Sequence, residues 1–422
     1  MSPVTSSLRI ALVSLHTSPG AEPGSGDAGG MNVVVRHQAE AMAALGHQVE
    51  ILTRRSSPEM PTTRRLSPGV TLRYLDAGPL RSVPKGDHEG FIDEFRVRAS
   101  ALGPWDVIHS HHWFSGMAML PLARELGVPH VQSFHSIAAD EATPLSAGER
   151  PESGGRMAGE AWLARESDLI VAISAAEADT VVQRLGGSMD RIAVVPPGVD
   201  GGMFHPLSSA GTPVTGTPVT GTSVSGASVS GADAHGYAVV AGRLQPLKGL
   251  DLAIEALAAV PAELRPELVI AGDASADYDG YIDELTRLAA RNGIADQVRF
   301  VGPCNREDLA GLMRGARVVL VPSHSETFGL VALEAAASGV PVVAQGTGGL
   351  REAVIDGDTG LLIESRDPQD WADALTAVLS DHALARRLSL AARRRAEEFD
   401  WPRSAAHLLK VYCTLLPVPV CA

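Results

Sequence analysis

The chain has 422 residues and a formal net charge of −14 at pH 7, which argues against a general nucleic-acid or anionic-membrane binder. Its length exceeds one ordinary hydrophobic core, so we expect two domains of roughly 200 residues each. Hydrophobic residues make up 45% and charged residues 20% of the chain, as is typical of soluble globular proteins.

Cysteine usage and apolar runs predict a cytoplasmic protein. The three cysteines, Cys304, Cys413 and Cys421, contain no CxxC pair, so we do not expect a disulfide framework. The apolar run at residues 9–15 is too short for a signal peptide, and no run of 18 apolar residues predicts a membrane span.

Short apolar runs alternate with longer amphipathic stretches in the first half of the chain. A helix is expected at residues 32–45, closed by Gly46. Strands that alternate with helices indicate parallel βαβ units. The expected strands are residues 10–15, 49–53, 107–109, 128–133, 169–173 and 192–195.

Residues 206–235 contain four pentads, GTPVT GTPVT GTSVS GASVS, that start at Gly211. Valine at every fifth position fits neither helix nor strand periodicity, so we interpret this segment as a flexible linker. The alternative is a functional repeat such as a glycosylated stalk, which the cytoplasmic interpretation disfavours.

The same alternation of strands and helices restarts after the repeat. We expect an N-terminal domain at 1–205, a C-terminal domain at 236–400 and a tail or helix at 401–422 that returns to the N-terminal domain. The strands expected in the C-terminal domain are residues 237–241, 268–271, 298–301, 318–321 and 340–344.

Gly24, Gly26 and Gly29 match the dinucleotide pattern G-x-G-x-x-G. The preceding strand ends near Leu15, however, and a dinucleotide fold places the first glycine directly after the strand. An NADP site that recruits Arg54 stays open, as does a mobile surface loop. A third interpretation is an anion site formed by backbone N–H groups at the start of the helix.

The second half of the chain carries more specific patterns. The segment AGRLQPLKG places Arg243 and Lys248 on the loop after a strand, where two cations suit a diphosphate; the alternative is two solvated surface cations. Glu326 lies in a loop and Glu334 is eight residues later, which we place two turns into a helix and on nearly the same face. Paired carboxylates there suit the hydroxyls of a ribose and of a second sugar. A further glycine-rich turn, GTGGLREAV, opens the next helix.

Together with SETFGL and EAAASGVPVVA, these motifs resemble the retaining glycosyltransferases of family 4, over about residues 9–401. The resemblance implies an α/β fold of the GT-B class, with two Rossmann-like doubly wound domains facing across a cleft.

Within that family, HTSPGAEPGSGDAGGMN is most similar to members that transfer N-acetylglucosamine from UDP-N-acetylglucosamine to 1D-myo-inositol 3-phosphate, in mycothiol biosynthesis. IHSHHWFSG, SFHS, and PES followed by Arg156 support the same resemblance. The implied partners are a UDP-sugar donor and a phosphorylated polyol acceptor, and a homodimer is possible for such enzymes.

The resemblance also assigns site residues. The implied catalytic residues are His135, Arg243, Lys248 and Glu326. The implied donor site consists of Glu22, Pro23, Gly30, Arg243, Lys248, Cys304, Glu326 and Glu334. The implied acceptor site consists of His16, Asp27, Ala28, Gly29, Gly30, Met31, Asn32, Lys85, His112, Ser136 and Arg156.

No metal is expected in the chemistry, because Arg243 and Lys248 would stabilise the leaving diphosphate in place of a metal. The resemblance adds a peripheral magnesium ion held by backbone oxygens of Arg314 and Ala316. His109, His111 and His112 could form a metal site, but no cysteine or acidic ligand accompanies them, so we expect cleft lining or core packing.

The chain departs from the family pattern at four places, and the one at Cys304 matters little because family members use that residue through its backbone near the uracil. His112 stands where these members usually have tyrosine, and it would bind phosphate best when protonated. Ser136 replaces threonine, and the acidic segment ADEATP replaces lysines, which could change the acceptor. The open alternatives are another UDP-sugar or polyol acceptor, a UDP-sugar epimerase, a non-catalytic sugar-nucleotide binder and an NADP oxidoreductase.

Overall fold

The computed structural model describes residues 7–22, 28–140, 142–145, 148–206, 236–273, 278 and 280–417. Their contacts form two compact units. Unit 1 takes in the described residues of Met1–Ala21, Gly30–Gly198 and Trp401–Ala422, and unit 2 those of Glu22–Gly29 and Val199–Asp400. The pentad repeat, for which a flexible linker is predicted, lies outside the described residues.

Unit 1 is built on a sheet of eight strands in the order β3-β4-β2-β1-β5-β6-β7-β8. All neighbours are parallel except β3 and β4. The strands are β1 Arg9–Val13, β2 Gln48–Arg54, β3 Thr63–Ser67, β4 Val70–Leu75, β5 Val107–His111, β6 His130–Ser133, β7 Leu169–Ala172 and β8 Ile192–Val194.

Helices cover both faces of this sheet, so its central strands are continuous apolar runs. Along β1, Ile10 and Leu12 belong to one buried cluster, and Ala11 and Val13 to the cluster on the other face. The helices are α1 Gly30–Ala44, α2 Ile92–Ala99, α3 Trp113–Leu126, α4 Arg156–Glu166, α5 Ala175–Leu185 and α13 Trp401–Cys413, with 3₁₀ turns η1 Lys85–Phe91 and η3 Met189–Arg191.

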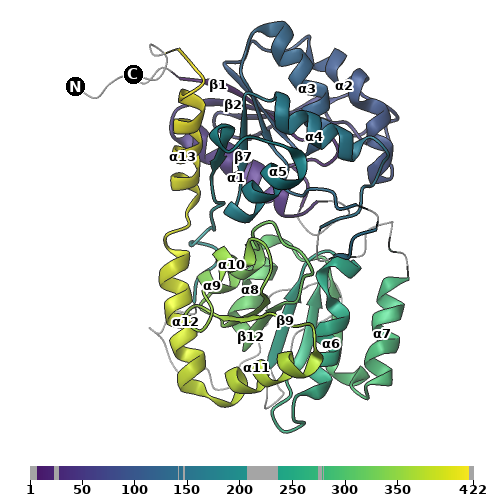
Figure 1. Cartoon of the computed structure of the whole chain (residues 1–422), viewed down its shortest axis with the longest axis vertical. Helices are drawn as coiled ribbons and strands as arrows, with labels where there is room; N and C mark the ends of the chain where they lie inside the picture. Colours follow the sequence, from purple (N-terminus) through teal and green to yellow (C-terminus); the bar gives the residue numbers. More distant parts are fainter. Residues whose placement is uncertain are drawn as a thin grey trace, which may run out of the picture. The chain divides into compact units, whose positions relative to one another are not determined.

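The C-terminal helix α13 packs against α1 on one face of the unit 1 sheet (Figure 1). Its side chains Ala405, Leu408 and Tyr412 are buried in the same cluster as Val35 and Met42 of α1. The last segment of the chain therefore completes the core of the unit that the first segment begins.

Unit 2 contains a fully parallel six-stranded sheet in the order β11-β10-β9-β12-β13-β14. Its strands are β9 Tyr237–Ala241, β10 Glu267–Ala271, β11 Val298–Gly302, β12 Val318–Val321, β13 Val342–Gln345 and β14 Leu361–Ile363. Its helices are α6 Leu250–Ala259, α7 Tyr281–Arg291, α8 Arg306–Gly315, α9 Leu330–Ala337, α10 Leu350–Ala353, α11 Pro368–Ser380 and α12 His382–Ala396, with 3₁₀ turns η4 Pro246–Lys248 and η6 Ala295–Gln297.

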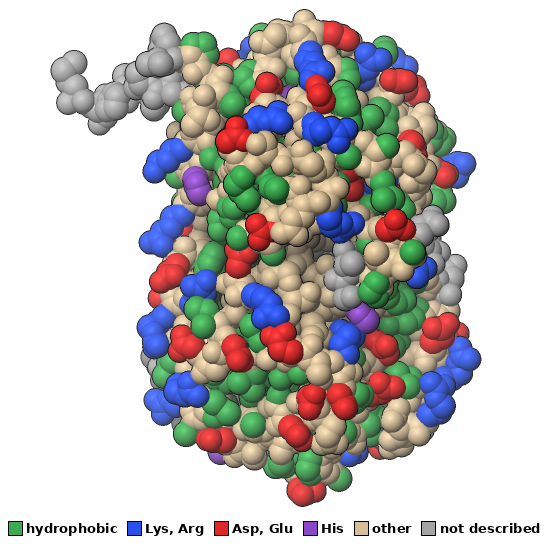
Figure 2. Space-filling model, in the orientation of Figure 1, with side chains coloured by type: hydrophobic (Ala, Val, Ile, Leu, Met, Phe, Trp, Pro, Cys, Tyr) green, Lys and Arg blue, Asp and Glu red, His purple; other side chains and the backbone are tan. Residues whose placement is uncertain are grey.

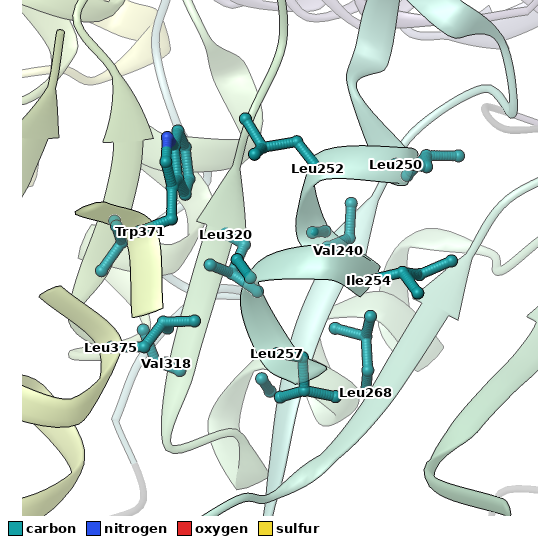
Figure 3. Close-up of a cluster of buried hydrophobic side chains, with 14 of the residues drawn as sticks. Val240, Leu250, Leu252, Ile254, Leu257, Leu268, Val318, Leu320, Trp371 and Leu375 are labelled. Atoms are coloured by element: carbon teal, nitrogen blue, oxygen red, sulfur yellow. The ribbon is translucent and has the colours of Figure 1, made fainter. Parts of the chain in front are cut away.

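One core cluster of unit 2 joins α6 and α11 to the sheet (Figure 3). Leu257 of α6 and Trp371 of α11 are fully buried in it beside Leu320 of β12. The expected pair of Rossmann-like α/β domains is confirmed by these two sheets.

Three further features complete the description. None of the described helices is both long enough and apolar enough to cross a membrane. Acidic and basic side chains are interspersed over the face seen in Figure 2. Cys304 is a free thiol, and Cys413 is disulfide-bonded, whereas Cys421 lies outside the described residues.

Several histidines are built into the core of unit 1 and lie on or beside β5 and β6. His109 contacts the Tyr412 hydroxyl at 2.6 Å through Nδ1 and Ser133 Oγ at 2.9 Å through Nε2. The Ser133 hydroxyl donates to the Val171 carbonyl, so His109 donates to Ser133 and accepts from Tyr412. Burial lowers the pKa of each of these histidines, to about 3 for His130 and about 4 for His135; the set is His109, His111, His112, His130 and His135.

We expect Leu257→Ala to lower the free energy of unfolding by about 2–5 kcal/mol, because the side chain is 0% exposed and its loss leaves a cavity. Leu390→Ala in α12 is the matched control, since Leu390 is 52% exposed. Urea denaturation followed by circular dichroism measures both. Equal losses would contradict the assigned core.

The buried histidines also predict a dependence of stability on pH. Their pKa values in the folded protein lie below the unfolded value near 6.5, so the unfolded chain binds more protons at pH 4–6.5. Stability is therefore lost as the pH falls through this window, by about 1.4 kcal/mol per pH unit for each fully titrating group. Glu177 acts in the opposite direction. Burial raises its pKa to about 7, so its protonation in the folded protein stabilises the fold as the pH falls, but it is one group against five histidines.

Thermal melting between pH 7.5 and 5 measures the effect. We expect His130→Gln to reduce the slope of the unfolding free energy against pH by the amount that corresponds to about one proton. The exposed control His407→Gln should leave this slope unchanged. A melting temperature that is flat across this range would show that the histidines are not held neutral by burial.

Candidate functional site

The strand order of unit 2 places a crevice between β9 and β12. Connections leave β9 toward β10 on one side and return to β12 on the other, and ligands bind at such switch points outside the carboxyl ends of the strands. Arg243 and Lys248 follow β9, and Glu326 follows β12. Three of the predicted donor residues therefore meet at this edge of the sheet.

Lys248 and Glu326 form an ion pair, with 2.5 Å between Nζ and Oε1. The Ser323 hydroxyl donates to the same carboxylate oxygen at 2.8 Å. Glu326 lies in the loop before α9 and Glu334 is the fifth residue of α9, as predicted, but the expected shared helix face does not apply because Glu326 is outside the helix. The loop places Glu326, and the sheet brings it to Lys248.

Glu334 is almost fully buried and pairs with Arg306, with 2.5 Å between Oε1 and Nη1. The Arg306 guanidinium lies 4.7 Å from the centre of the Phe204 ring. The sequence analysis missed Arg306. The sequence feature that could have indicated Arg306 is the helix-capping residue Asn305 directly before it, which places Arg306 at the start of α8.

Two glycines allow the loops of unit 2 to approach closely. Gly249 has φ of +64°, and a Cβ there would lie 2.1 Å from the Pro322 carbonyl oxygen. A Cβ on Gly349 would lie 2.1 Å from the Thr327 carbonyl oxygen. Any side chain at these positions would push the loop that carries Glu326 away from Lys248.

Unit 1 has its own switch point, between β1 and β5. His16 follows β1 and His112 follows β5, and their ring centres are 4.4 Å apart. His112 is buried, has φ of +67° and, among the described residues, has no hydrogen-bond partner at either ring nitrogen. A buried, unpaired imidazole held in a strained backbone conformation is characteristic of a ligand site.

The protonated form of His112, which would bind a phosphate best, is disfavoured in this structure. Burial lowers its pKa well below 6.5, and the nearby His16, Lys85 and Arg156 lower it further. The ring is therefore neutral and offers one N–H donor and one acceptor.

The predicted phosphate-binding residues lie close together beside His112. Arg156, the first residue of α4, is 0% exposed and donates from Nη2 to Ser136 Oγ at 3.0 Å. Lys85 begins η1 and approaches Glu149 at 3.4 Å and Glu152 at 3.9 Å. The sequence analysis recognised the cations but not the carboxylates around them.

Three carboxylates surround Arg156. Glu160 accepts from Nε at 2.7 Å, Glu152 pairs with Nη1, and Glu149 lies 3.5 Å from Nη1. Burial alone would lower the pKa of Arg156, but the three carboxylates outweigh it and raise the pKa. Arg156 and Glu160 are an i, i+4 pair on α4, and Glu152 precedes the helix by one further interval of four residues; this spacing was the available signal.

His135, the predicted reaction-centre residue, contacts His111 through its ring, with 2.8 Å between Nε2 and Nδ1. It has φ of +60°. Glu177 accepts from the backbone N–H groups of Ile173 and His135 and lies behind this turn. Glu177 is a supporting residue that the sequence analysis missed; its signal was the S-x-x-E capping box that begins at Ser174.

The remaining predicted residues fall into three groups. Asn32 is buried and donates to the Thr17 hydroxyl and the Ser18 carbonyl, so it secures the start of α1. Ala28, which is buried, and Gly29 lie directly before α1, and Gly30 and Met31 form its first turn. Glu22 lies further upstream and is exposed. Pro23, Gly24, Gly26 and Asp27 lie outside the described residues.

Cys304 and the predicted magnesium ligands lie at the two ends of α8. Cys304 precedes the helix, and burial raises the pKa of its thiol. Arg314 and Ala316 lie at the carboxyl end, where helix carbonyls lack intrahelical partners and favour a cation. No group of three histidine, cysteine or acidic side chains suited to a metal occurs in the described part of the chain.

Two family models match the chain. Residues 29–198 match the glycosyl transferase 4-like domain, and residues 231–395 match glycosyl transferases group 1. Among solved structures, sucrose-phosphate synthase from Thermosynechococcus elongatus is similar with a TM-score of 0.84 and 28% identity, covering 97% of this chain and 99% of that one.

Two relatives match almost end to end. The D-inositol 3-phosphate glycosyltransferase of Xylanimonas cellulosilytica is 40% identical over 416 residues, 97% of each chain. That of Stackebrandtia nassauensis is 42% identical over 415 residues, which cover 96% of this chain and 91% of the relative. The chain therefore belongs to the family of D-inositol 3-phosphate glycosyltransferases, and it is a glycosyltransferase with the GT-B fold.

Proposed function

We propose that this enzyme transfers N-acetylglucosamine, with retention, from UDP-N-acetylglucosamine to 1D-myo-inositol 3-phosphate, the first glycosylation step of mycothiol biosynthesis. The names of the relatives support the acceptor. The observation that carries the proposal is in unit 1, where Lys85, Arg156 and Ser136 converge beside the unpaired ring of His112. Two cations and neutral donors suit a ligand that bears both phosphate and hydroxyl groups.

The donor half of the proposal rests on unit 2. Arg243 and Lys248 would meet the charge that develops on the departing β-phosphate, so catalysis would be mainly electrostatic. Glu326 would bind the transferred sugar and Glu334 the ribose. The leaving phosphate itself would accept the proton of the acceptor hydroxyl, and His135 would lie beside the sugar.

The proposal includes a cytoplasmic enzyme that can form a homodimer and whose chemistry requires no metal. A magnesium ion at the carboxyl end of α8 would be peripheral, held by backbone oxygens of Arg314 and Ala316, and would supply local structure rather than a catalytic step. Activity that survives a chelating agent is the expected result.

Release of UDP from UDP-N-acetylglucosamine tests the reaction directly. We expect release only when inositol 3-phosphate is present. Formation of an epimer without acceptor would instead support an epimerase, and a near-ultraviolet change on adding NADPH would support the oxidoreductase alternative.

We expect Arg243→Ala to lower kcat at least tenfold, about 1.4 kcal/mol of transition-state stabilisation, because the leaving diphosphate loses a cation. Arg287→Ala in α7 is the control, since Arg287 is exposed and donates to the Asp283 carbonyl of its own helix. A smaller loss in Arg243→Ala would contradict the leaving-group role.

Lys85→Ala tests the phosphate half of the acceptor site. We expect it to raise KM for inositol 3-phosphate about tenfold or more, the cost of about one charge-assisted contact, and to leave transfer to unphosphorylated inositol nearly unchanged. Lys410→Ala, at an exposed position on α13, controls for the loss of a lysine. Equal effects on both acceptors would show that Lys85 does not bind the phosphate.

A further inference from the structure

A single carboxylate oxygen is shared by the groups that the proposed function assigns to the acceptor phosphate. Glu149 Oε2 accepts from the Ser136 hydroxyl at 3.1 Å and lies 3.4 Å from Lys85 Nζ and 3.5 Å from Arg156 Nη1. These donors come from the loop after β6, from η1 and from α4. Their convergence on one oxygen defines an anion position, which Glu149 fills.

Of the three carboxylates, Glu149 makes the longest contact to Arg156. Its contacts to the two cations exceed the 2.7–2.9 Å usual for charge-assisted hydrogen bonds, whereas Glu160 reaches Arg156 at 2.7 Å. The Glu149 side chain is 19% exposed, compared with 1% for Glu160. Glu160 and Glu152 are therefore the permanent partners of Arg156, and Glu149 is the replaceable one.

The backbone at Glu149 is anchored independently of its side chain. Its carbonyl accepts from the Ala139 N–H at 2.6 Å, and the residue bridges to Ala138. A change of side-chain rotamer is therefore enough to withdraw the carboxylate, and the loop need not refold.

Charge repulsion favours this withdrawal. Two cations, Lys85 and Arg156, already face three carboxylates. A phosphate added to this cluster would meet net negative charge in a largely buried site, which is strongly unfavourable. A phosphate that replaces Glu149 adds about one negative charge instead of about two, and it offers more acceptor oxygens to the same donors and to His112.

We propose that Glu149 is a built-in competitor of the acceptor phosphate: its carboxylate occupies the phosphate position in the free enzyme and leaves when a phosphorylated acceptor binds. The inference rests on the proposed acceptor site. It makes Glu149 a specificity-determining residue, because a phosphate displaces the carboxylate from the two cations, whereas a neutral polyol does not. Because of this competition, the apparent affinity for the phosphorylated acceptor is the intrinsic affinity multiplied by the fraction of enzyme in which Glu149 has left the phosphate position.

Glu149→Gln removes the charge and keeps the side-chain size. We expect it to lower KM for inositol 3-phosphate about fivefold or more, with kcat little changed. Glu149→Asp, which keeps the charge on a shorter side chain, should fall between Glu149→Gln and the wild type. Glu125→Gln, an exposed residue of α3, removes the same charge elsewhere and should change nothing. Circular dichroism and melting establish that each variant is folded.

Inorganic phosphate provides a readout independent of transfer. Calorimetry should show tighter phosphate binding to Glu149→Gln than to the wild type, and no gain for Glu125→Gln. If Glu149→Gln binds phosphate more tightly but the enzyme does not transfer to inositol 3-phosphate, the proposed acceptor is wrong and the role of Glu149 as a competitor is supported. If Glu149→Gln transfers normally with an unchanged or raised KM and gains no phosphate affinity, Glu149 is not a competitor and the proposed acceptor stands.

Discussion

The order of parallel strands is the constraint on which both halves of this protein depend. In each unit the chain leaves a central strand in one direction and returns on its other side, so loops from distant parts of the sequence meet at one edge of the sheet. Lys248 and Glu326 are 78 residues apart and form an ion pair through this arrangement. His16 and His112 meet in unit 1 for the same reason.

Charge compensation is the second theme. The chain is acidic overall, yet each unit gathers cations at its switch point, where Lys248 in unit 2 and Lys85 and Arg156 in unit 1 lie beside carboxylates. A buried guanidinium such as Arg156 is tolerated only with anionic partners. Glu160 is one of them and accepts a hydrogen bond from Arg156 Nε at 2.7 Å. The same rule underlies the proposal that one carboxylate, Glu149, leaves when a further anion binds.

Much of the fold could be predicted, because buried parallel strands are short apolar runs that need no partner to be recognised. The strands β9 and β12 begin and end where the apolar runs do. The edge strand β3, TRRLS, was missed because it is largely exposed and carries two arginines. The strand β4, VTLRYL, was also missed, although its alternation of apolar and polar residues is a strand signal.

The sequence by itself determined the family, the pair of α/β domains and the cations and carboxylates that the proposed function assigns to the substrates, since motifs and periodicity are local properties. Only the tertiary structure decided the partners of those groups: Arg306 for Glu334, Glu177 behind His135, and Glu149 between Lys85 and Arg156. It also decided that His112 is neutral, because burial sets that pKa. Pairing and desolvation arise from packing of distant segments, and no local pattern records them.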